Sequence, residues 1–271
     1  MDEPLAPMEP VLWPTPFDDG DWQFEVKWDG VRCLAYAPAG RPVRLYGRKG
    51  GEWTERFSEI GAPLEGSGLV LDGELVVLQD GRPSFHAMLR RLHRTGGPVH
   101  YMVFDCLQAD GRDLRREGVE RRQAELAGLP PSPWLHRIEV VLGEGRRLYE
   151  TVGSSGLEGI VAKRRASRYV AGRSDLWRKV KCWRRVLCRV VGVDEAKGDI
   201  RSVRLALAQG GEFVPVGTCG NLGARAAAEL RQALAAGPVD AEVAYLDWTD
   251  QGRLRHPRWL GVVSPGGRGP A

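Results

Sequence analysis

The residue types that could carry chemistry are concentrated in residues 25–32, EVKWDGVR, where a strand-like run ends in a turn. A lysine attacks phosphorus only as the free amine, so Lys27 needs nearby cations, desolvation or a metal to lower its proton affinity. Gly30 allows the chain to turn close to a nucleotide, and Arg32 is suited to holding a phosphate or a sugar. Lys27 is therefore the candidate nucleophile of a phosphoryl transfer. Taken alone, the same pattern also fits an ordinary hairpin turn with a surface lysine.

The elements that must position this turn are mostly strands. Strand-like runs separated by Gly, Pro and Asp turn signals cover Trp22–Lys27, Val31–Ala37, Val43–Gly47, Leu69–Leu78 and His100–Leu107. Short helices are predicted at Phe85–Leu92, Glu117–Ala127 and Leu148–Ser155. The first part of the chain is thus predicted to consist of antiparallel sheets flanked by helices.

After Lys181 the pattern changes to alternating runs broken by Gly-rich turns. The predicted strands are Val186–Val193, Ser202–Ala208, Phe213–Cys219 and Ala241–Trp248, with one Ala-rich helix at Ala224–Ala235. Such short strands predict a small β-barrel. A length of 271 residues also favours two domains. We predict that these are residues 1–184 and 185–271, with a hinge near Lys181–Val186.

The composition is that of a soluble globular protein, with 42% hydrophobic and 27% charged residues. Basic residues form short clusters, such as residues 163–165 (KRR), which suit a phosphate-bearing partner or form a solvated charged face. The five cysteines show no Cys-x-x-Cys spacing, which argues against a zinc site or a disulfide framework. No signal sequence or apolar run of membrane-spanning length is present, so we expect a cytoplasmic, nucleoid-associated protein.

The segment around Lys27 resembles the nucleotidyl-transfer motif of the covalent nucleotidyltransferases, and five further segments resemble that family's other motifs in order. They are residues 46–50 (YGRKG), 71–76 (LDGELV), 101–105 (YMVFD), 158–163 (EGIVAK) and 177–181 (WRKVK). The resemblance covers nearly the whole chain. It implies an α+β fold, in which an ATP-grasp-like adenylation domain of antiparallel sheets and flanking helices precedes an all-β OB-fold barrel.

The resemblance also assigns nucleotide contacts. It implies that Arg48 holds a phosphate, that Phe104 stacks on the purine, and that Glu25 hydrogen-bonds the adenine and favours ATP over GTP. Arg32 and Lys163 complete this expected set. The structural alternative is strongest for Phe104, which could simply be a core residue.

Two carboxylates and two lysines are expected at the phosphates. Glu74 and Glu158 carry hard oxygen donors that suit Mg²⁺ or Mn²⁺. Lys179 and Lys181 alternate on a strand with Val180 between them, so both amines can face one pocket and contact the α-phosphate. The structural alternatives are a turn acid for Glu74 and a solvated strand face for the lysines.

Within the family, the chain is most similar to bacterial ATP-dependent DNA ligases of the non-homologous end-joining group. The similarity rests on residues 158–165 (EGIVAKRR), followed by 167–169 (SRY) and 172–174 (GRS). Residues 216–220 (VGTCG) and 248–257 (WTDQGRLRHP) resemble that group's OB domain, whose groove follows a nucleic-acid backbone. The expected DNA contacts are Arg48, Arg173, Arg253, Arg255 and Arg258, of which the last three are expected to contact either DNA or pyrophosphate. For the last three, a basic barrel edge that avoids strand pairing is the alternative.

The activity implied by this resemblance has three steps. Lys27 attacks ATP to give a lysyl-AMP, AMP passes to the 5′-phosphate of DNA, and the neighbouring 3′-hydroxyl displaces AMP to seal the strand. The implied cofactors are ATP and Mg²⁺ or Mn²⁺. The implied partners are duplex DNA with nicks or ends, a Ku-type end-bridging protein and a separate repair polymerase or primase, with the ligase itself monomeric.

One segment departs from the family pattern. The last motif normally has an Arg followed closely by Asp-Lys, whereas residues 260–263 (LGVV) here run into 264–267 (SPGG). In relatives that motif orients the pyrophosphate, so self-adenylylation is the step that this departure places in question. Two rival functions stay open, and this departure motivates the second of them. They are an RNA ligase or GTP-dependent capping enzyme, and a DNA-end-binding protein without catalysis.

Overall fold

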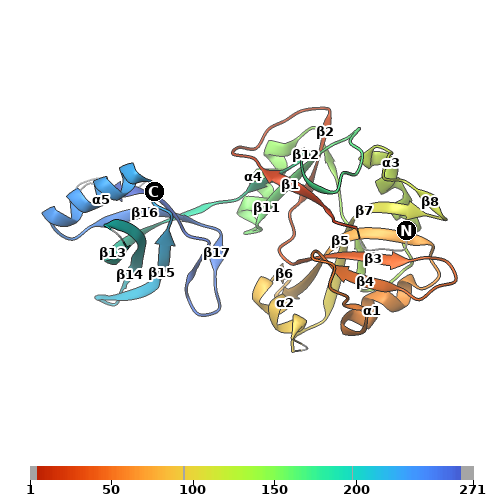
Figure 1. Ribbon diagram of the computed structural model, residues 1–271, viewed down its shortest axis with the longest axis horizontal. Coiled ribbons are helices and arrows are strands. Elements are labelled where there is room, and N and C mark those ends of the chain that lie inside the picture. Colours follow the sequence, from red (N-terminus) through yellow and green to blue (C-terminus); the bar gives the residue numbers. More distant parts are fainter. Residues whose placement is uncertain (1–4, 94, 197, 264–271) are drawn as a thin grey trace. The chain divides into compact units, whose positions relative to one another are not determined.

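The computed structural model describes residues 5–93, 95–196 and 198–263. The chain divides into two compact units, Met1–Cys182 and Trp183–Ala271 (Figure 1). This division lies two residues before the boundary predicted from the sequence. It falls between strand β12 (Gly172–Lys181) and strand β13 (Arg184–Ala196), where the charged segment that ends the first unit meets the β-branched run of the second.

A seven-stranded sheet forms one layer of the first unit, in the order β4-β3-β5-β7-β8, with β6 paired to β5 and β9 paired to β7. Its strands are β3 (Val31–Ala37), β4 (Arg44–Gly47), β5 (Leu69–Gln79), β6 (Arg82–Pro83), β7 (Val99–Ala109), β8 (Arg112–Asp113) and β9 (Leu135–Arg137). All of these pairs are antiparallel except β7 with β9.

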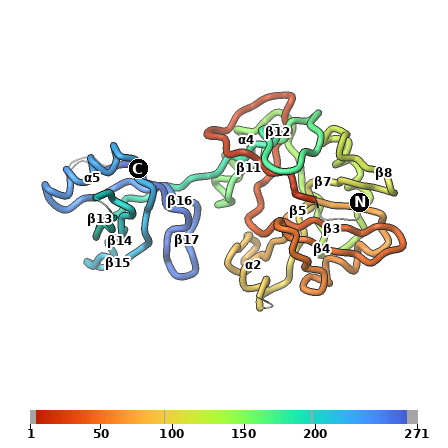
Figure 2. Tube along the Cα trace, in the orientation of Figure 1, coloured from red at the N-terminus to blue at the C-terminus, as the bar shows by residue number. Residues whose placement is uncertain are grey.

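A five-stranded sheet forms the second layer, in the order β1-β12-β11-β2-β10. Its strands are β1 (Met8–Leu12), β2 (Trp22–Val26), β10 (Val141–Leu142), β11 (Gly159–Arg164) and β12 (Gly172–Lys181). Figure 2 traces how these segments, far apart in sequence, come together. The central antiparallel pairs join β2 to β11 and β11 to β12, whereas β1 runs parallel to β12.

Helices cover the outer faces of these sheets. They are α1 (Ser58–Gly61), α2 (Phe85–Leu92), α3 (Val119–Ala124) and α4 (Gly145–Ser154), with 3₁₀ turns η1 (Thr54–Phe57), η2 (Ala62–Leu64) and η3 (Glu125–Gly128). Helix α2 begins where the Oγ atom of Ser84 accepts a hydrogen bond from the backbone N–H of Ala87, at 3.2 Å. Such a side-chain cap satisfies one of the N–H groups that the first helical turn leaves unpaired.

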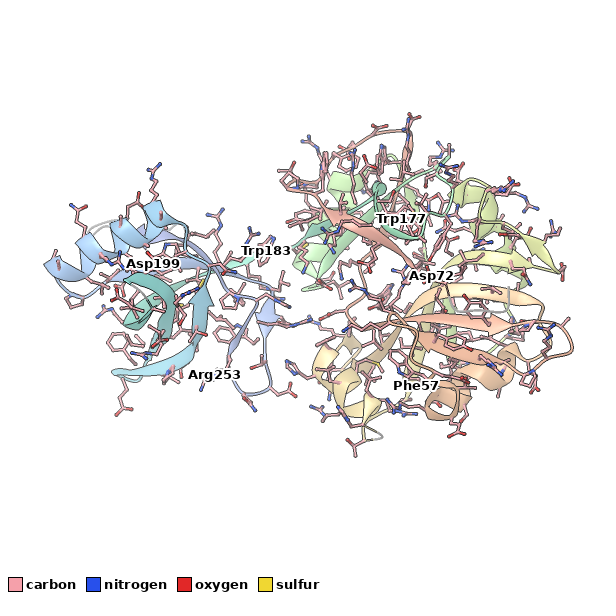
Figure 3. The ribbon with its side chains drawn as sticks, viewed as in Figure 1. Phe57, Asp72, Trp177, Trp183, Asp199 and Arg253 are labelled. Atoms are coloured by element: carbon pink, nitrogen blue, oxygen red, sulfur yellow. The ribbon has the colours of Figure 1, made fainter. Side chains whose placement is uncertain are left out.

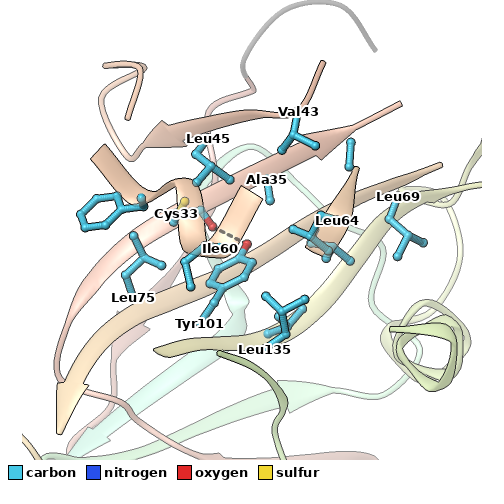
Figure 4. Packing of buried hydrophobic residues seen from close by; sticks show 14 of the residues in the cluster. Cys33, Ala35, Val43, Leu45, Ile60, Leu64, Leu69, Leu75, Tyr101 and Leu135 are labelled. Atoms are coloured by element: carbon cyan, nitrogen blue, oxygen red, sulfur yellow. Dashed lines mark hydrogen bonds between the residues drawn. The ribbon is translucent and has the colours of Figure 1, made fainter. Parts of the chain in front are cut away.

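Strand β5 is buried on both faces, which explains why apolar residues occupy both of its alternating sets of positions on either side of residues 72–74. Leu71 and Leu75 point into a cluster shared with α1 and α2, where the Tyr101 hydroxyl donates to the carbonyl of Cys33 at 2.9 Å (Figure 4). Val70 and Val76 point into the cluster between the two sheets. The alternation places Glu74 on the inter-sheet face of β5, with Val70 and Val76.

The second unit is a strongly bent antiparallel sheet in the order β15-β14-β13-β16-β19. Its elements are β13 (Arg184–Ala196), β14 (Asp199–Gln209), β15 (Glu212–Gly220), α5 (Ala224–Ala236), β16 (Asp240–Tyr245), β17 (Asp247–Trp248), β18 (Leu254–Arg255) and β19 (Arg258–Val263). The edge strands β15 and β19 approach each other, and the Cys219 thiol lies 3.5 Å from the carbonyl oxygen of Pro257. This half-barrel fits the OB fold that the sequence predicts.

Most predicted elements are confirmed, and α2 and β3 have the predicted bounds. The helix expected at Leu148–Ser155 runs from Gly145 to Ser154, and two further predictions are wrong in detail. The helix expected at Glu117–Ala127 begins only at Val119, because Gly118 is extended, and it tightens into η3. The strand expected at Ala241–Trp248 breaks at Leu246, whose N–H bonds to the carbonyl of Arg255 as the chain leaves β16 for the β17–β18 hairpin. No helix in the described ranges is long and apolar enough to span a bilayer.

Candidate active site

A cavity of about 870 Å³ lies within the first unit and is lined by both sheets. Its size is within the range of small-molecule and cofactor sites. Eight residues predicted from the sequence line it: Glu25, Lys27, Arg32, Arg48, Glu74, Phe104, Lys163 and Lys179. The structure therefore gathers into one cavity side chains that are spread over more than 150 residues of sequence.

Lys27 follows β2 directly and is held by the neighbouring strand. Its backbone N–H donates to the carbonyl of Gly159 at 2.8 Å, which continues the pairing of β2 with β11. Its Nζ atom lies 2.5 Å from Oε2 of Glu158, and the other carboxylate oxygen lies 3.3 Å from Nζ of Lys181. Burial opposes the ionisation of Glu158, but the ammonium groups of Lys27 and Lys181 outweigh it and lower the pKa of the carboxyl.

Two glycines set the backbone around this pair. A Cβ atom on Gly159 would lie 2.2 Å from the carbonyl oxygen of Val180, and this residue has φ +151°, which disfavours any side chain. A Cβ atom on Gly30 would lie 2.0 Å from the carbonyl oxygen of Leu75. The loop after Lys27 can therefore pack directly on β5 only because Gly30 has no side chain.

Glu74 enters the cavity from β5. Burial raises its pKa to about 7, although the cations of Lys27 and Arg32 oppose the shift. For a buried carboxyl with a raised pKa, an additional cation nearby stabilises the ionised form. Among the described residues there is no group of three or more His, Cys, Asp or Glu side chains that could hold a metal by themselves. Glu74 with Glu158 nevertheless fits Mg²⁺, which commonly takes one or two carboxylates and completes its shell with water and substrate phosphates.

The lysines near Glu158 form a positively charged wall. Lys179 lines the cavity from β12, and its pKa is lowered by desolvation and by the charges of Lys27, Lys181 and Arg173. Like charges repel one another in a partly buried site, and a bound anion offsets this repulsion. The arrangement is therefore suited to a phosphate group placed between Lys27 and Lys179.

A buried ion pair also lines the cavity, at the end where Phe104 and Trp177 lie. Oε2 of Glu25 lies 2.7 Å from Nζ of Lys163, and these side chains are 2% and 1% exposed. Burial raises the pKa of Glu25 and lowers that of Lys163. The Lys163 ammonium also lies 4.4 Å from the ring centre of Phe104 and 4.3 Å from that of Trp177. This end combines aromatic surface with a hydrogen-bonding carboxylate, as a purine base requires.

Arg32 is more strongly engaged with the protein than the sequence predicts. Its Nε and Nη2 atoms donate to the carboxylate of Asp72 at 2.5 and 2.6 Å, and Nη2 also donates to the carbonyl of Met8 at 3.0 Å. The Tyr169 hydroxyl donates to the same carboxylate at 2.6 Å. Figure 3 labels Asp72, the carboxylate that binds Arg32, and Trp177, both in the first unit. A contact from Arg32 to a nucleotide stays a prediction.

The residues predicted to contact DNA are found in several places. Arg48 lies at the cavity and binds Glu9 through two hydrogen bonds of 2.7 and 2.8 Å. Arg173 is exposed on β12. Arg253, Arg255 and Arg258 belong to the second unit, where the Arg258 guanidinium lies 4.8 Å from the ring centre of Trp183. The predicted departure at residues 264–267 lies outside the described residues.

Several polar residues of the site were not predicted individually. Asp72 and Asp105 lie on the predicted strands but are 0% exposed, and Arg122 is equally buried and binds Asp105 at 2.6 Å. Gln23 and Gln123 surround Glu25. A charged residue inside an apolar strand is a signal that a sequence offers for Asp72 and Asp105. No comparable signal marks Gln123, which lies on a short polar helix.

Comparison with known proteins agrees with this geometry. The family model described as "ATP dependent DNA ligase domain" matches residues 15–181. The multifunctional non-homologous end joining protein LigD of Pseudomonas aeruginosa is 38% identical over 194 residues, which cover 68% of this chain and 23% of that protein. LigD of Mycobacterium tuberculosis H37Rv is 33% identical over 275 residues, covering 89% and 36% respectively. The chain thus spans between about a quarter and a third of the length of these relatives.

The comparison with solved structures also finds similarity to a DNA ligase. Mycobacterial DNA ligase D complexed with ATP and MES is 31% identical, with 97% of this chain and 96% of that chain covered and a TM-score of 0.61. That coverage includes both units described above.

Proposed function

Because this chain belongs to the ATP-dependent DNA ligase family, we propose that Lys27 takes AMP from ATP and passes it to a DNA 5′-phosphate. The observation that carries this proposal is the position of Lys27. Its amine lies in a nucleotide-sized cavity, bound to Glu158 and close to Lys179. The proposed nucleophile, anion-binding wall and base-binding end therefore share one cavity.

The first step forms a bond between Nζ of Lys27 and the α-phosphorus of ATP, and the bond to pyrophosphate breaks. The amine must lose a proton, and the negative charge that develops on the phosphate must be balanced. Lys179 and Lys181 are in place to balance it, since charged donors that are already oriented need no rearrangement during the reaction. Phosphoryl transfer of this kind depends mainly on positioning and charge.

In the later steps AMP moves from Lys27 to the 5′-phosphate of DNA, and the adjacent 3′-hydroxyl displaces AMP as the strand is sealed. Each step replaces one bond to phosphorus by another, so no oxidant or reductant is needed. Arg48 and Arg173 in the first unit, with Arg253, Arg255 and Arg258 in the second, are proposed to hold the DNA backbone.

Glu74 and Glu158 would hold a divalent cation, Mg²⁺ or Mn²⁺. When bound, such a cation would polarise the phosphate and offset its negative charge. Glu74 supports this assignment, because a carboxyl whose pKa is raised to about 7 by burial binds a cation in exchange for its proton. Glu158 would exchange part of its contact with Lys27 for the cation and so release the amine.

The base-binding end is proposed to select adenine. Glu25 would accept a hydrogen bond from the 6-amino group, Phe104 would stack on the purine, and Lys163 holds the carboxylate in place. Arg32 is proposed to reach the sugar or a phosphate from its bidentate contact with Asp72. An acceptor at this position favours ATP over GTP, because guanine presents a carbonyl oxygen there.

The names of the relatives suggest a role in non-homologous end joining. We propose that the ligase acts in the cytoplasm, at the nucleoid, as a monomer on nicks or double-strand ends. We also propose a Ku-type end-bridging protein and a repair polymerase or primase as partners. Affinity purification of the tagged protein from cells with damaged DNA tests this. Recovery of neither partner would contradict the end-joining role and leave ligation intact.

The experiment for the central proposal measures the mass of the intact protein. Bound AMP is first removed with pyrophosphate, and ATP and GTP are then offered together with Mg²⁺. We expect an AMP adduct on wild-type protein that disappears when nicked DNA is added, and no adduct on Lys27→Ala. Full labelling of Lys27→Ala would refute the mechanism. A GMP adduct would support a capping enzyme, and nick binding without any adduct would support a DNA-end-binding protein.

A further inference from the structure

Behind the base-binding end of the cavity, two glutamines form a bridge between Glu25 and Phe104. The Nε2 atom of Gln123 donates to Oε1 of Glu25 at 2.6 Å and to the carbonyl oxygen of Phe104 at 2.7 Å. The Nε2 atom of Gln23 donates to Oε1 of Gln123 at 2.7 Å and to Oε1 of Glu25 at 3.1 Å. We call Gln23 and Gln123 the glutamine bridge.

The orientation of the Gln123 amide follows from its partners. An amide carries two N–H donors on nitrogen, and both are used here on oxygen atoms, one of the Glu25 carboxyl group and one of the Phe104 carbonyl. Rotating the amide by half a turn would place its oxygen against both acceptors and its nitrogen against the Gln23 donor. Only the observed orientation gives every donor of the two amides an acceptor, so the hydrogen bonds of the glutamine bridge hold Glu25 in one orientation.

Lys163 binds the same two residues as Gln123. Its ammonium donates to Oε2 of Glu25 and, at 3.1 Å, to the carbonyl oxygen of Phe104. Gln123 and Lys163 therefore join the same two groups, the carboxylate that would read the base and the backbone of the residue that would stack on it. Gln123 reaches them from α3, 98 residues away from Glu25 in sequence.

We propose that Gln123 is a positioning residue for base selection, which holds Glu25 as a fixed hydrogen-bond acceptor and ties it to Phe104. This inference rests on the proposed function, in which Glu25 reads the 6-position of the purine. A fixed acceptor accepts from the 6-amino group of adenine and repels a 6-carbonyl oxygen. A carboxyl released from its donors can rotate or take up a proton, and then donate to that oxygen.

The charges facing Glu25 support this account. Burial raises the pKa of Glu25 and outweighs the Lys163 ammonium and the Gln123 amide, which lower it, so loss of the Gln123 donor would favour the protonated carboxyl further. Asp105 also raises this pKa, and its own charge is offset by Arg122 at 2.6 Å. Lys163 forms an ion pair with Glu25, and two uncharged donors add to it, Gln123 at 2.6 Å and Gln23 at 3.1 Å.

The surroundings of the bridge decide which variants are informative. Gln23 and Gln123 also line a second cavity of about 480 Å³, whereas Glu25 and Phe104 line the first. Shortening Gln123 to Ala would let water from the second cavity replace the lost donor. Gln123→Met keeps the length and removes the hydrogen bonds, and Gln123→Glu keeps the shape and replaces the donor by an acceptor.

The test compares ATP with inosine triphosphate, because hypoxanthine differs from adenine in carrying a carbonyl at position 6. The rate of lysyl-nucleotide formation is measured for each at varied concentration. For Gln123→Met and Gln123→Glu we expect the preference for ATP to fall by about tenfold or more, the effect of losing a hydrogen bond to a charged group. The KM for ATP should rise more than the maximal rate falls, since Lys27 is not part of the bridge.

Two further variants act as controls. Gln23→Met should change the preference in the same direction by a smaller factor, because Gln23 lies 3.1 Å from Glu25. Gln79→Met, at an exposed glutamine at the end of β5, should leave it unchanged. In the Gln123 variants the use of inosine triphosphate should increase as pH falls, because a protonated Glu25 donates to the carbonyl.

The outcomes separate this inference from the proposed function. If the wild-type protein forms no lysyl-AMP, the proposed function fails first. If it does, and both Gln123 variants keep the wild-type preference at every pH while losing only thermal stability, then Gln123 is merely structural and the inference is overturned. Because the preference is a ratio measured on the folded fraction, a partly unfolded variant still reports it.

Discussion

The Nζ atom of Lys27 lies 2.5 Å from Oε2 of Glu158, although 131 residues separate them in sequence. The contact results from strand register, because Val26 of β2 pairs with Ile160 of β11 and places the residues at the two strand ends together. Glu158 also contacts Lys181 at 3.3 Å, at the end of β12. One carboxylate thus organises the nucleophile and a lysine of the anion-binding wall.

We expect Glu158→Gln to slow lysyl-AMP formation by about tenfold or more, as loss of a charge-assisted contact in a partly buried site implies. The amide keeps the volume but removes the charge that orients Lys27 and Lys181 and one of the two proposed cation ligands. Initial rates across a Mg²⁺ titration provide the measurement. Glu144→Gln, at an exposed carboxylate paired with Arg147, is the matched control. A variant with the wild-type metal dependence would disprove the ligand role.

Gly30→Ala should damage both stability and adenylylation. The new Cβ atom would meet the backbone carbonyl of Leu75 at 2.0 Å, and backbone cannot move aside as a flexible side chain can. Overpacking of this kind typically costs about 1–3 kcal/mol, and here the displaced loop is the one that follows Lys27. Urea unfolding and adduct formation are measured together. Gly20→Ala, where a Cβ atom would have no neighbour within 4 Å, should change neither, and equal behaviour of the two variants would contradict the expected clash.

Local patterns in the sequence predict those elements whose apolar spacing is regular. Helix α2 shows helical spacing with a Ser cap, and β3 is a run of β-formers between turn signals, so both have their predicted bounds. Strand β1 was not predicted, because its sequence MEPVL contains a proline, and its register with β12 shifts between Pro10 and Val11. Strand β1 is held by a parallel pairing over a long sequence distance, for which local patterns give no signal.

In the candidate site, too, local sequence patterns predict some residues and not others. Lys27, Glu74 and Lys179 were predicted because they lie in short motifs, and the fold brings them to one cavity. The partners that hold such residues were not predicted, because Gln123 and Arg122 reach their carboxylates across the fold from a helix with no motif of its own. Sequence motifs mark the groups proposed to touch the substrate, whereas the supporting contacts depend on tertiary structure.

Breaking the buried pair of Arg122 and Asp105 should strongly destabilise the first unit. Both side chains are 0% exposed, and Arg122 also donates to the carbonyls of Glu117 and Ser167 at 2.7 and 2.8 Å. Arg122→Met would leave Asp105 as a buried charge without its partner, which typically costs about 3–5 kcal/mol. Denaturant unfolding measures the change.

Its neighbour offers a control with the same substitution. Arg121 is half exposed and pairs with Glu125 one helical turn away. Arg121→Met should therefore cost only about 0.3–0.5 kcal/mol, as is usual for exposed pairs with this spacing. If both variants lose a similar free energy of unfolding, burial is not the reason for the cost of removing Arg122.

Glu74 should make the nucleotide-free protein less stable as pH rises. Its pKa is raised from an ordinary value of 4.5 to about 7, so folding favours the protonated form. At pH 4 the carboxyl is largely protonated in both the folded and the unfolded protein, so the penalty is small. Between pH 4.5 and 7 the unfolded form loses its proton first, and the folded protein loses up to about 3 kcal/mol by pH 8.

The variant Glu74→Gln imitates the protonated carboxyl at every pH. It should match the wild type near pH 4 and exceed it increasingly above pH 5 in urea unfolding with a metal chelator present. Glu144→Gln, at an exposed carboxylate, should show no such trend. A difference between Glu74→Gln and wild type that does not change with pH would contradict the raised pKa.

The arginines of the second unit should contribute to DNA binding and not to lysyl-AMP formation. Arg253 and Arg258 are exposed, and Arg255 lies between them on β18. Each contact to a phosphate releases counterions, so each Arg→Ala change should lower the slope of log K against log salt by about 0.9 for a duplex. Nick binding is measured at several salt concentrations beside adduct formation on the same protein. Arg225→Ala, an exposed arginine paired with Glu229 on α5, is the control for loss of charge alone. An equal loss of binding in that control would assign the effect to net charge and not to a defined DNA contact.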